Sequence, residues 1–337
     1  MQLMDKVRHS TVRLRYGRMS RKLLLAVFSI SAVAQTKDLS QRLREALSGY
    51  GEGEVAAQKL AANDFNSVEE LLVKRAAVAG ADRPELLSLE GSVAFLAGRM
   101  NAAVQYFGEA AAVAPIQEGD AFTLAMALVR LGNVQRAAEV LSQLVREHPQ
   151  QSLYVYWLGR LDYGERRYPE AVAKLQRALE LDPKFARAWD SLGLAFDMQS
   201  QTEQAYAALT KAADLNRTLP RPSAWPPHDL GYLCLRMEKL SEAVNALEES
   251  LRFDPKLALA HYHLARVLEK QSRDPQAILE YKNAIADDPS ASDACYSLAM
   301  LYRKLQRERE AAAMFGEYRK RKQAEAGAAA STLVEPR

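Results

Sequence analysis

The chain has 337 residues, of which 48% are hydrophobic and 26% are charged, and its formal net charge is +3. This is the composition of a folded protein, and the length is too great for one ordinary compact core, so several domains or a repeat array are expected. Residues 1–34 hold seven basic side chains and one acidic one, so the remainder, with 38 basic against 41 acidic residues, is mildly acidic and gives no support for binding nucleic acid or a bilayer surface.

The first recognisable element is typical of a secretory leader. Residues 20–34 run from a basic start through an apolar stretch to an Ala-Val-Ala sequence, which is the order of a signal peptide. We therefore expect cleavage near Ala34 and Gln35 and an exported chain, periplasmic or secreted, with a cytoplasmic chain as the alternative. The residues before Met19 are either a long basic leader or the product of a start upstream of the true one at Met19. The apolar stretch is too short to span a bilayer comfortably, so no stable membrane span is predicted.

The rest of the chain repeats with a period of 34 residues. Alanine recurs at this interval, with one longer step of 38, at Ala103, Ala137, Ala171, Ala205, Ala243, Ala277 and Ala311. Twelve residues before each alanine stands a small residue, in the column Gly91, Ala125, Gly159, Gly193, Gly231, Ala265 and Ala299. Four residues after each alanine stands a large one, in the column Phe107, Leu141, Leu175, Leu209, Leu247, Tyr281 and Phe315. These columns predict paired antiparallel helices, because small residues let two helices approach and the large ones fill the groove beside that contact.

This repeat resembles the tetratricopeptide repeat. The unit that carries the resemblance most fully contains Trp189, Leu192, Gly193, Phe196, Ala205 and Leu209, which look like the Trp, Leu-Gly, Tyr, Ala and Phe signature of that family. Proline cannot continue a helix, and it closes most units, at Pro115, Pro149, Pro183, Pro255 and Pro289. The resemblance implies an all-α fold, a right-handed α-solenoid of stacked helix-turn-helix repeats.

The columns also predict the organisation of the chain. Residues 35–83 are expected to form an N-terminal helical segment with a degenerate first repeat, residues 84–325 seven repeats, and residues 326–337 a disordered tail. The longer step holds four extra residues near 220–223, followed by two prolines that can open the next helix. We interpret this stretch as a longer loop between repeats. The alternatives are a local change of superhelical pitch and a binding element built on Trp225.

The resemblance also implies where a partner binds. In the family, the first helices of the repeats line a concave face that is the usual peptide site. The positions that face inward in this chain are Phe122, Met126, Tyr156, Arg160, Tyr163, Asp190, Asp197, His228, Tyr232, Tyr262, Arg266, Tyr296, Met300 and Arg303. Tyr and Arg dominate binding hot spots, so a protein or peptide partner with some acidic character would fit. The alternative is that several of these tyrosines pack between neighbouring repeats.

Patterns that would point to chemistry are weak. His261 and His263 stand two residues apart on a predicted helix and so point about 200° away from each other, which argues against a shared metal ion. Cys234 and Cys295 fall two repeats apart, too far for a disulfide, and are interpreted as small buried residues. No phosphate-binding loop, nucleophile elbow or other catalytic motif is found in the sequence. We therefore predict no cofactor, no metal and no enzymatic activity.

The function expected from these patterns is that of an interaction scaffold. Our first hypothesis is an exported scaffold that holds a partner protein in an envelope assembly. The alternatives are a cytosolic adaptor and a regulatory subunit of an enzyme complex. A chaperone cofactor is disfavoured, because the Lys and Asn clamp that such family members use is not found on the first helices. The sequence does not identify the partner or the oligomeric state.

Overall fold

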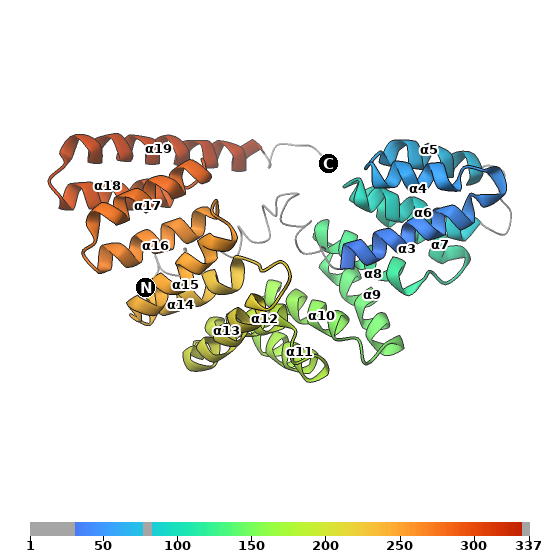
Figure 1. Ribbon diagram of the computed structural model, residues 1–337, viewed down its shortest axis with the longest axis horizontal. Coiled ribbons are helices and arrows are strands. Elements are labelled where there is room, and N and C mark those ends of the chain that lie inside the picture. Colours follow the sequence, from blue (N-terminus) through green and yellow to red (C-terminus); the bar gives the residue numbers. More distant parts are fainter. Residues whose placement is uncertain (1–30, 77–82, 332–337) are drawn as a thin grey trace. The chain divides into compact units, whose positions relative to one another are not determined.

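The computed structural model describes residues 31–76 and 83–331, and within these ranges the chain forms seventeen α-helices and no β-strand (Figure 1). The expected all-α repeat fold is thus confirmed. The chain divides into two compact units, residues 1–149 and 150–337, which are described separately below. Among the described helices, none combines the length and the apolar character that crossing a bilayer requires.

The first unit begins with three helices and continues with two helix pairs. The three helices are α3 (Ser31–Ala46), α4 (Gly53–Ala61) and α5 (Phe65–Ala76), and the pairs are α6 (Arg83–Leu96) with α7 (Met100–Val113) and α8 (Glu118–Arg130) with α9 (Val134–Glu147). One apolar core joins α3, α4 and α5 to α6 through Leu39, Leu43, Leu47, Leu60, Val68, Leu72, Leu86, Leu89 and Val93. The three helices therefore close the apolar edge of the first pair, as terminal elements of a repeat array must.

The second unit consists of five helix pairs. They are α10 (Ser152–Gly164) with α11 (Tyr168–Leu181), α12 (Ala186–Met198) with α13 (Thr202–Arg217), α14 (Trp225–Arg236) with α15 (Leu240–Phe253), α16 (Ala258–Lys270) with α17 (Asp274–Asp287), and α18 (Ser292–Lys304) with α19 (Glu308–Ser331). The first helices α10, α12 and α14 each pack on the next first helix, whereas among the described residues no comparable packing joins the second helices of this unit. The first helices therefore line the inner side of this stack.

The close contact inside each pair lies between the small column and the large column. In the pair α12–α13, a Cβ atom added at Gly193 would lie 2.6 Å from Cγ of Leu209. In the pair α14–α15, a Cβ atom added at Gly231 would lie 2.7 Å from Cγ of Leu247. The large side chain thus sits directly on the small residue of the first helix. Because Leu209 and Leu247 are almost fully buried, this fit sets the separation of the two helices.

The turn between the helices of each pair is the same throughout the repeats. A residue with positive φ stands at Gly98, Gly132, Arg166, Ser200, Glu238, Ser272 and Gln306. The amide of the following residue then bonds to the carbonyl five positions earlier, as in the 2.9 Å bond from Arg273 N to Leu268 O. This is the Schellman ending of a helix, which satisfies carbonyls that would otherwise lack partners.

The four extra residues form a fixed loop between α13 and α14. The Asn216 side chain exchanges two hydrogen bonds of 2.8 Å with the backbone of Ser223, and Ser250 Oγ donates to Ala224 O at 2.8 Å. Pro226 and Pro227 lie in the first turn of α14, as predicted. The interpretation as a longer loop therefore agrees with these contacts, while a role of Trp225 in binding stays a prediction.

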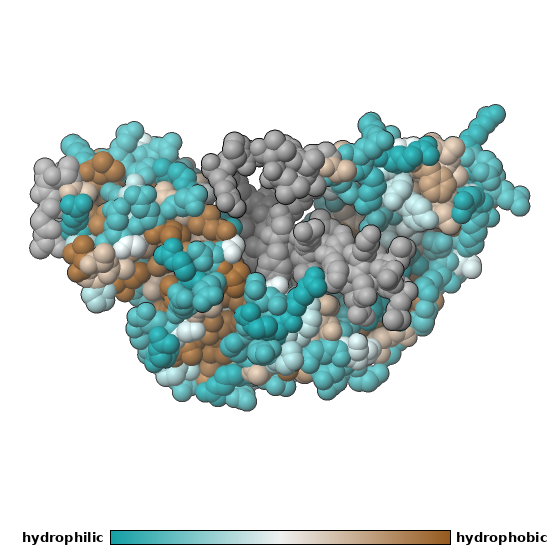
Figure 2. Space-filling model, turned by 180° about the vertical axis from the view of Figure 1, so that it is seen from behind, coloured by the Kyte–Doolittle hydropathy of each residue, from teal (hydrophilic) through white to brown (hydrophobic). Residues whose placement is uncertain are grey.

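The last helix differs from expectation at its end. The disordered tail was expected from residue 326, but α19 continues to Ser331, since the alanines of this stretch are strong helix formers. Its basic side chains are interleaved with acidic ones, as in the pairs Arg321–Glu317 and Lys322–Glu325. Figure 2 shows hydrophilic side chains over most of the surface at α18 and α19 in that view, which is typical of a solvated terminal helix.

Candidate partner-binding surface

All the residues predicted to face inward lie on first helices, but they differ in how far they are open to solvent. The structure buries Phe122, Met126, Tyr156, Tyr163, Asp190 and His228. It half-buries Arg160, Asp197, Tyr232, Tyr262, Arg266 and Met300, and it exposes Tyr296 and Arg303. Six of these eight open or half-open residues lie on α14, α16 and α18, while Arg160 lies on α10 and Asp197 on α12. We call the inner side of α14, α16 and α18 the inner wall.

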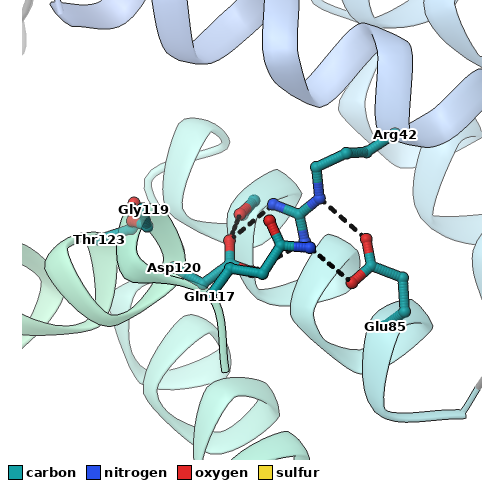
Figure 3. A network of polar contacts seen from close by, with 7 residues as sticks. Arg42, Glu85, Gln117, Gly119, Asp120 and Thr123 are labelled. Carbon is teal, nitrogen blue, oxygen red and sulfur yellow. Dashed lines mark hydrogen bonds and ion pairs between the residues drawn. The ribbon is translucent and has the colours of Figure 1, made fainter. Parts of the chain in front are cut away.

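In the first unit, helix α3 lies over the first helix of the first pair, at positions that correspond to the inward-facing ones of later repeats (Figure 3). Arg42 of α3 donates to Glu85 of α6 at 2.8 Å and to both carboxylate oxygens of Asp120 of α8 at 2.8 and 3.0 Å. Ser92, one period before Met126, is 9% exposed and donates to Asp120 at 3.1 Å. Arg42 of α3 therefore links the first helices α6 and α8 through part-buried ion pairs, which sequence reasoning did not find.

Two of the predicted tyrosines pack between helices. The Tyr156 ring lies 4.8 Å from the ring of Phe185 and 5.6 Å from that of Trp157, and the Tyr163 ring lies 5.6 Å from that of Tyr168. Both tyrosines are almost fully buried. Such contacts are those of core aromatic residues. Tyr163 thus packs within the pair α10–α11, while Tyr156 contacts Phe185, which directly precedes α12.

His228 belongs to a buried hydrogen-bond chain between α14 and α16. Its Nδ1 lies 2.9 Å from Asp229 Oδ1 and its Nε2 lies 3.0 Å from His263 Nδ1. The His263 ring stacks on Tyr232 at 4.5 Å. Burial, and after it His228 and Arg266, hold the pKa of His263 well below its ordinary value, so His263 is neutral at pH 7. The chain therefore joins two first helices beneath the inner wall.

His261 and His263 point to different partners, as their spacing predicted. His261 Nδ1 lies 2.5 Å from Glu280 Oε2 of α17, and Nε2 lies 3.0 Å from Pro255 O. In the described part of the chain, no group of three or more His, Cys, Asp or Glu side chains is placed to hold a metal ion.

The two cysteines are buried free thiols, Cys234 and Cys295. Burial, followed by the charge of Glu242, raises the pKa of Cys234 to about 11.

The ion pair of His261 makes the second unit more stable at mildly acidic pH. Burial lowers the pKa of His261, but the hydrogen bonds to Glu280 and Pro255 and the charges of Glu280 and Asp287 together raise it by more, so it lies above its ordinary value. A raised histidine pKa contributes stability that is complete below the unfolded pKa and is lost as pH rises through the folded pKa. We expect His261→Gln to cost about 1–3 kcal/mol near about pH 5.5 and less at alkaline pH, as measured by denaturant unfolding. His263→Gln is the matched control, and its cost should shrink towards acidic pH because the pKa of His263 is lowered.

The open part of the inner wall is formed by tyrosines and arginines. The Arg266 guanidinium lies 5.8 Å from the Tyr262 ring centre on α16. On α18, Tyr296 is 45% exposed, and its ring lies 5.9 Å from that of Phe315 and 5.3 Å from that of Tyr318. Arg303 lies 5.8 Å from the Phe315 ring centre. Aromatic rings with guanidinium groups beside them suit a peptide that has both apolar and acidic side chains.

The comparison with known proteins agrees with this repeat architecture. A sequence model of the tetratricopeptide repeat family matches residues 122–184, 158–220 and 228–294. The chain is a tetratricopeptide repeat protein. Proteins of this family are in general interaction scaffolds and not enzymes. The matches cover the inner-wall residues Tyr232, Tyr262 and Arg266, and they end at residue 294, in the first turn of α18.

Individual relatives share parts of this tetratricopeptide repeat array. The chain is 22% identical over 177 residues to a DnaJ homolog subfamily C member 7 homolog of Dictyostelium discoideum, covering 49% of this chain and 33% of that protein. It is 26% identical over 209 residues to anaphase-promoting complex subunit 6 of Arabidopsis thaliana, covering 59% of this chain and 38% of that protein. The chain thus spans about a third of the length of these curated relatives.

A solved tetratricopeptide repeat protein from Parabacteroides merdae shares the fold over a longer stretch. It superposes with a TM-score of 0.59 at 18% identity, over 77% of this chain and 99% of its own. At 18% identity, this similarity shows a shared fold and no more.

Proposed function

We propose that this tetratricopeptide repeat protein is a non-enzymatic scaffold that binds a partner protein or peptide on its inner wall, as part of an exported, envelope-associated assembly. The observation that carries the binding proposal is that Tyr232, Tyr262, Arg266, Tyr296 and Arg303, all on first helices, remain open or half-open. Open aromatic and arginine side chains on a rigid helical support are the usual anchors of a protein interface. The general scaffold role of the family supports the same proposal.

The export part of the proposal is supported by the sequence alone. The basic, apolar and Ala-Val-Ala order of residues 20–34 is that of a signal peptide. Most of this stretch lies outside the described residues, and the expected cleavage between Ala34 and Gln35 falls in the first turn of α3. Removal of the leader would leave Leu39, Leu43 and Leu47, which anchor α3, in the mature chain.

The experiment is affinity capture of the native protein from its own cells, with mass spectrometry of the partners and of the mature amino terminus. We expect a terminus at Gln35 and a reproducible partner that is lost from the variant Arg160→Glu with Arg266→Glu. The matched control is Lys211→Glu with Arg252→Glu, which places the same charge changes at exposed positions on the second helices α13 and α15. Helicity and melting temperature should be nearly unchanged in both variants.

The outcomes separate the parts of the proposal. An intact leader with cytosolic partners would replace the exported scaffold with a cytosolic adaptor. Stable co-purification of a catalytic subunit would identify a regulatory subunit of an enzyme complex. A partner retained by the first-helix variant Arg160→Glu with Arg266→Glu and lost from the control variant would move the binding site to the second helices.

A further inference from the structure

We infer that the partner presents an acidic segment to the C-terminal end of the inner wall, where Arg266 and Arg303 bind its carboxylates and Tyr262 and Tyr296 contact its apolar side chains. This inference rests on the proposed function and adds the chemical class of the partner. The positive side chains on α14, α16 and α18 differ in whether a carboxylate of the described chain pairs with them.

Three cations of these helices are used to join neighbouring pairs. Arg236 of α14 contacts Asp197 of α12 at 2.5 and 2.6 Å. One and two repeats further on, Lys270 contacts Glu238 at 2.6 Å and Lys304 contacts Asp274 at 3.5 Å. Each of these contacts links a first helix to the preceding pair. The charges of these three cations are therefore already compensated within the stack.

Arg266 and Arg303 are placed differently. Arg266 is half-buried on Tyr262, and Arg303 is exposed beside Phe315 with Nη2 3.1 Å from Met300 Sδ. Within residues 31–76 and 83–331, no ion pair connects either guanidinium to a carboxylate. A guanidinium that lies over an aromatic ring keeps N–H groups at its edge, and these can bind a carboxylate through two hydrogen bonds. Among the described residues, the two arginines thus provide positive charges that no salt bridge compensates.

The aromatic residues beside the arginines define the rest of the site. Tyr262 and Tyr296 stand one period apart, on α16 and α18, in the halves of these helices that precede the arginines. Asp293 is exposed in the first turn of α18, at the opposite end of that helix from Arg303. Glu269 follows Arg266 on α16 and accepts a hydrogen bond from the Tyr281 hydroxyl at 2.9 Å. A partner that avoids Asp293 would place its apolar side chains on the tyrosines and its carboxylates at the arginines.

The test is selection from a random linear peptide library on the immobilised full-length chain. Peptides selected by the wild-type chain should be enriched in Asp and Glu beside an aromatic or aliphatic residue. Their affinity should fall about a hundredfold in Arg266→Glu with Arg303→Glu, since two charge-assisted contacts are lost. It should fall less in Arg266→Lys with Arg303→Lys, which keeps the charge but not the paired N–H groups. Binding should also weaken as salt is raised.

Two results would overturn the inference while leaving the proposed function intact. One is the selection of inner-wall peptides with no excess of acidic residues. The other is either unchanged binding of acidic peptides by the Arg266→Glu with Arg303→Glu variant, or a loss of binding that the control Lys211→Glu with Arg252→Glu shows equally. A library from which the wild-type chain selects nothing, although circular dichroism shows it folded, would instead contradict peptide binding itself.

Discussion

Replacing Arg42 by methionine is expected to lower the free energy of unfolding of the first unit by about 3–5 kcal/mol. The side chains of Arg42 and Asp120 are 11% and 3% exposed, and the guanidinium contacts both oxygens of this carboxylate. Its removal would leave the Asp120 charge buried with only Ser92 as a hydrogen-bond donor among the contacts described above. Glu85, which is 36% exposed at its side chain, can be solvated and should contribute less.

The chain offers a matched control and a selective readout for this prediction. Arg44 lies on the same helix and pairs with Glu54, but the side chains are 43% and 60% exposed, so Arg44→Met should change stability by less than about 1 kcal/mol. All three tryptophans lie after residue 149. Denaturant unfolding should therefore shift when followed by circular dichroism and stay unchanged when followed by tryptophan fluorescence. Equal effects of the two substitutions would show that the Arg42 ion pair contributes no special stability.

Replacing Tyr281 by alanine is expected to cost about 3–5 kcal/mol in the second unit, because it empties a large site in the core. Tyr281 of α17 is 1% exposed, and its hydroxyl donates to Glu269 Oε2 at 2.9 Å. Its ring lies 6.1 Å from that of Tyr262 on the inner wall. The cavity would thus open directly behind an expected partner contact, and tryptophan fluorescence in denaturant should report the loss.

Two milder substitutions separate the contributions of Tyr281. Tyr281→Leu installs the residue that four other repeats use in this column and should cost roughly 1–2 kcal/mol. Tyr281→Phe removes only the hydroxyl, and because Glu269 is half-buried and can reach solvent, its cost should stay near about 1 kcal/mol. If alanine proved no worse than leucine, the site would have to collapse around the missing ring, and its tight packing would be refuted.

The helix pairs could be predicted because each repeat packs its two helices together with the same residue types at equivalent positions. The contact of Gly193 with Leu209 recurs as Gly231 with Leu247, so a period was visible in the sequence. The turn column was not recognised, although Gly98 and Gly132 stand one period apart. Later repeats place Arg, Ser, Glu, Ser and Gln at this position. A non-glycine residue in this conformation costs only about 1–2 kcal/mol, so the turn tolerates many residues and leaves little signal.

The candidate site could be predicted only in part. The helical period assigns a residue to a face, and all the predicted inward residues do lie on first helices. It does not reveal what covers that face. His228 is buried by a contact with His263, 35 residues away, and Asp120 by a contact with Arg42, 78 residues away. Such contacts depend on tertiary neighbours, so they leave no periodic trace in the sequence.

The loop held by Asn216 limits how the array can change by recombination. Elsewhere a whole repeat can be duplicated or deleted with every column kept in place, because each step has the same length. At the junction of α13 and α14, the Asn216 contacts to Ser223 and the Ser250 contact to Ala224 fit only a step that is four residues longer. Recombination at this junction would separate Asn216 from Ser223 and so remove the contacts that hold the loop. The repeats on its two sides are therefore expected to have diversified as separate blocks.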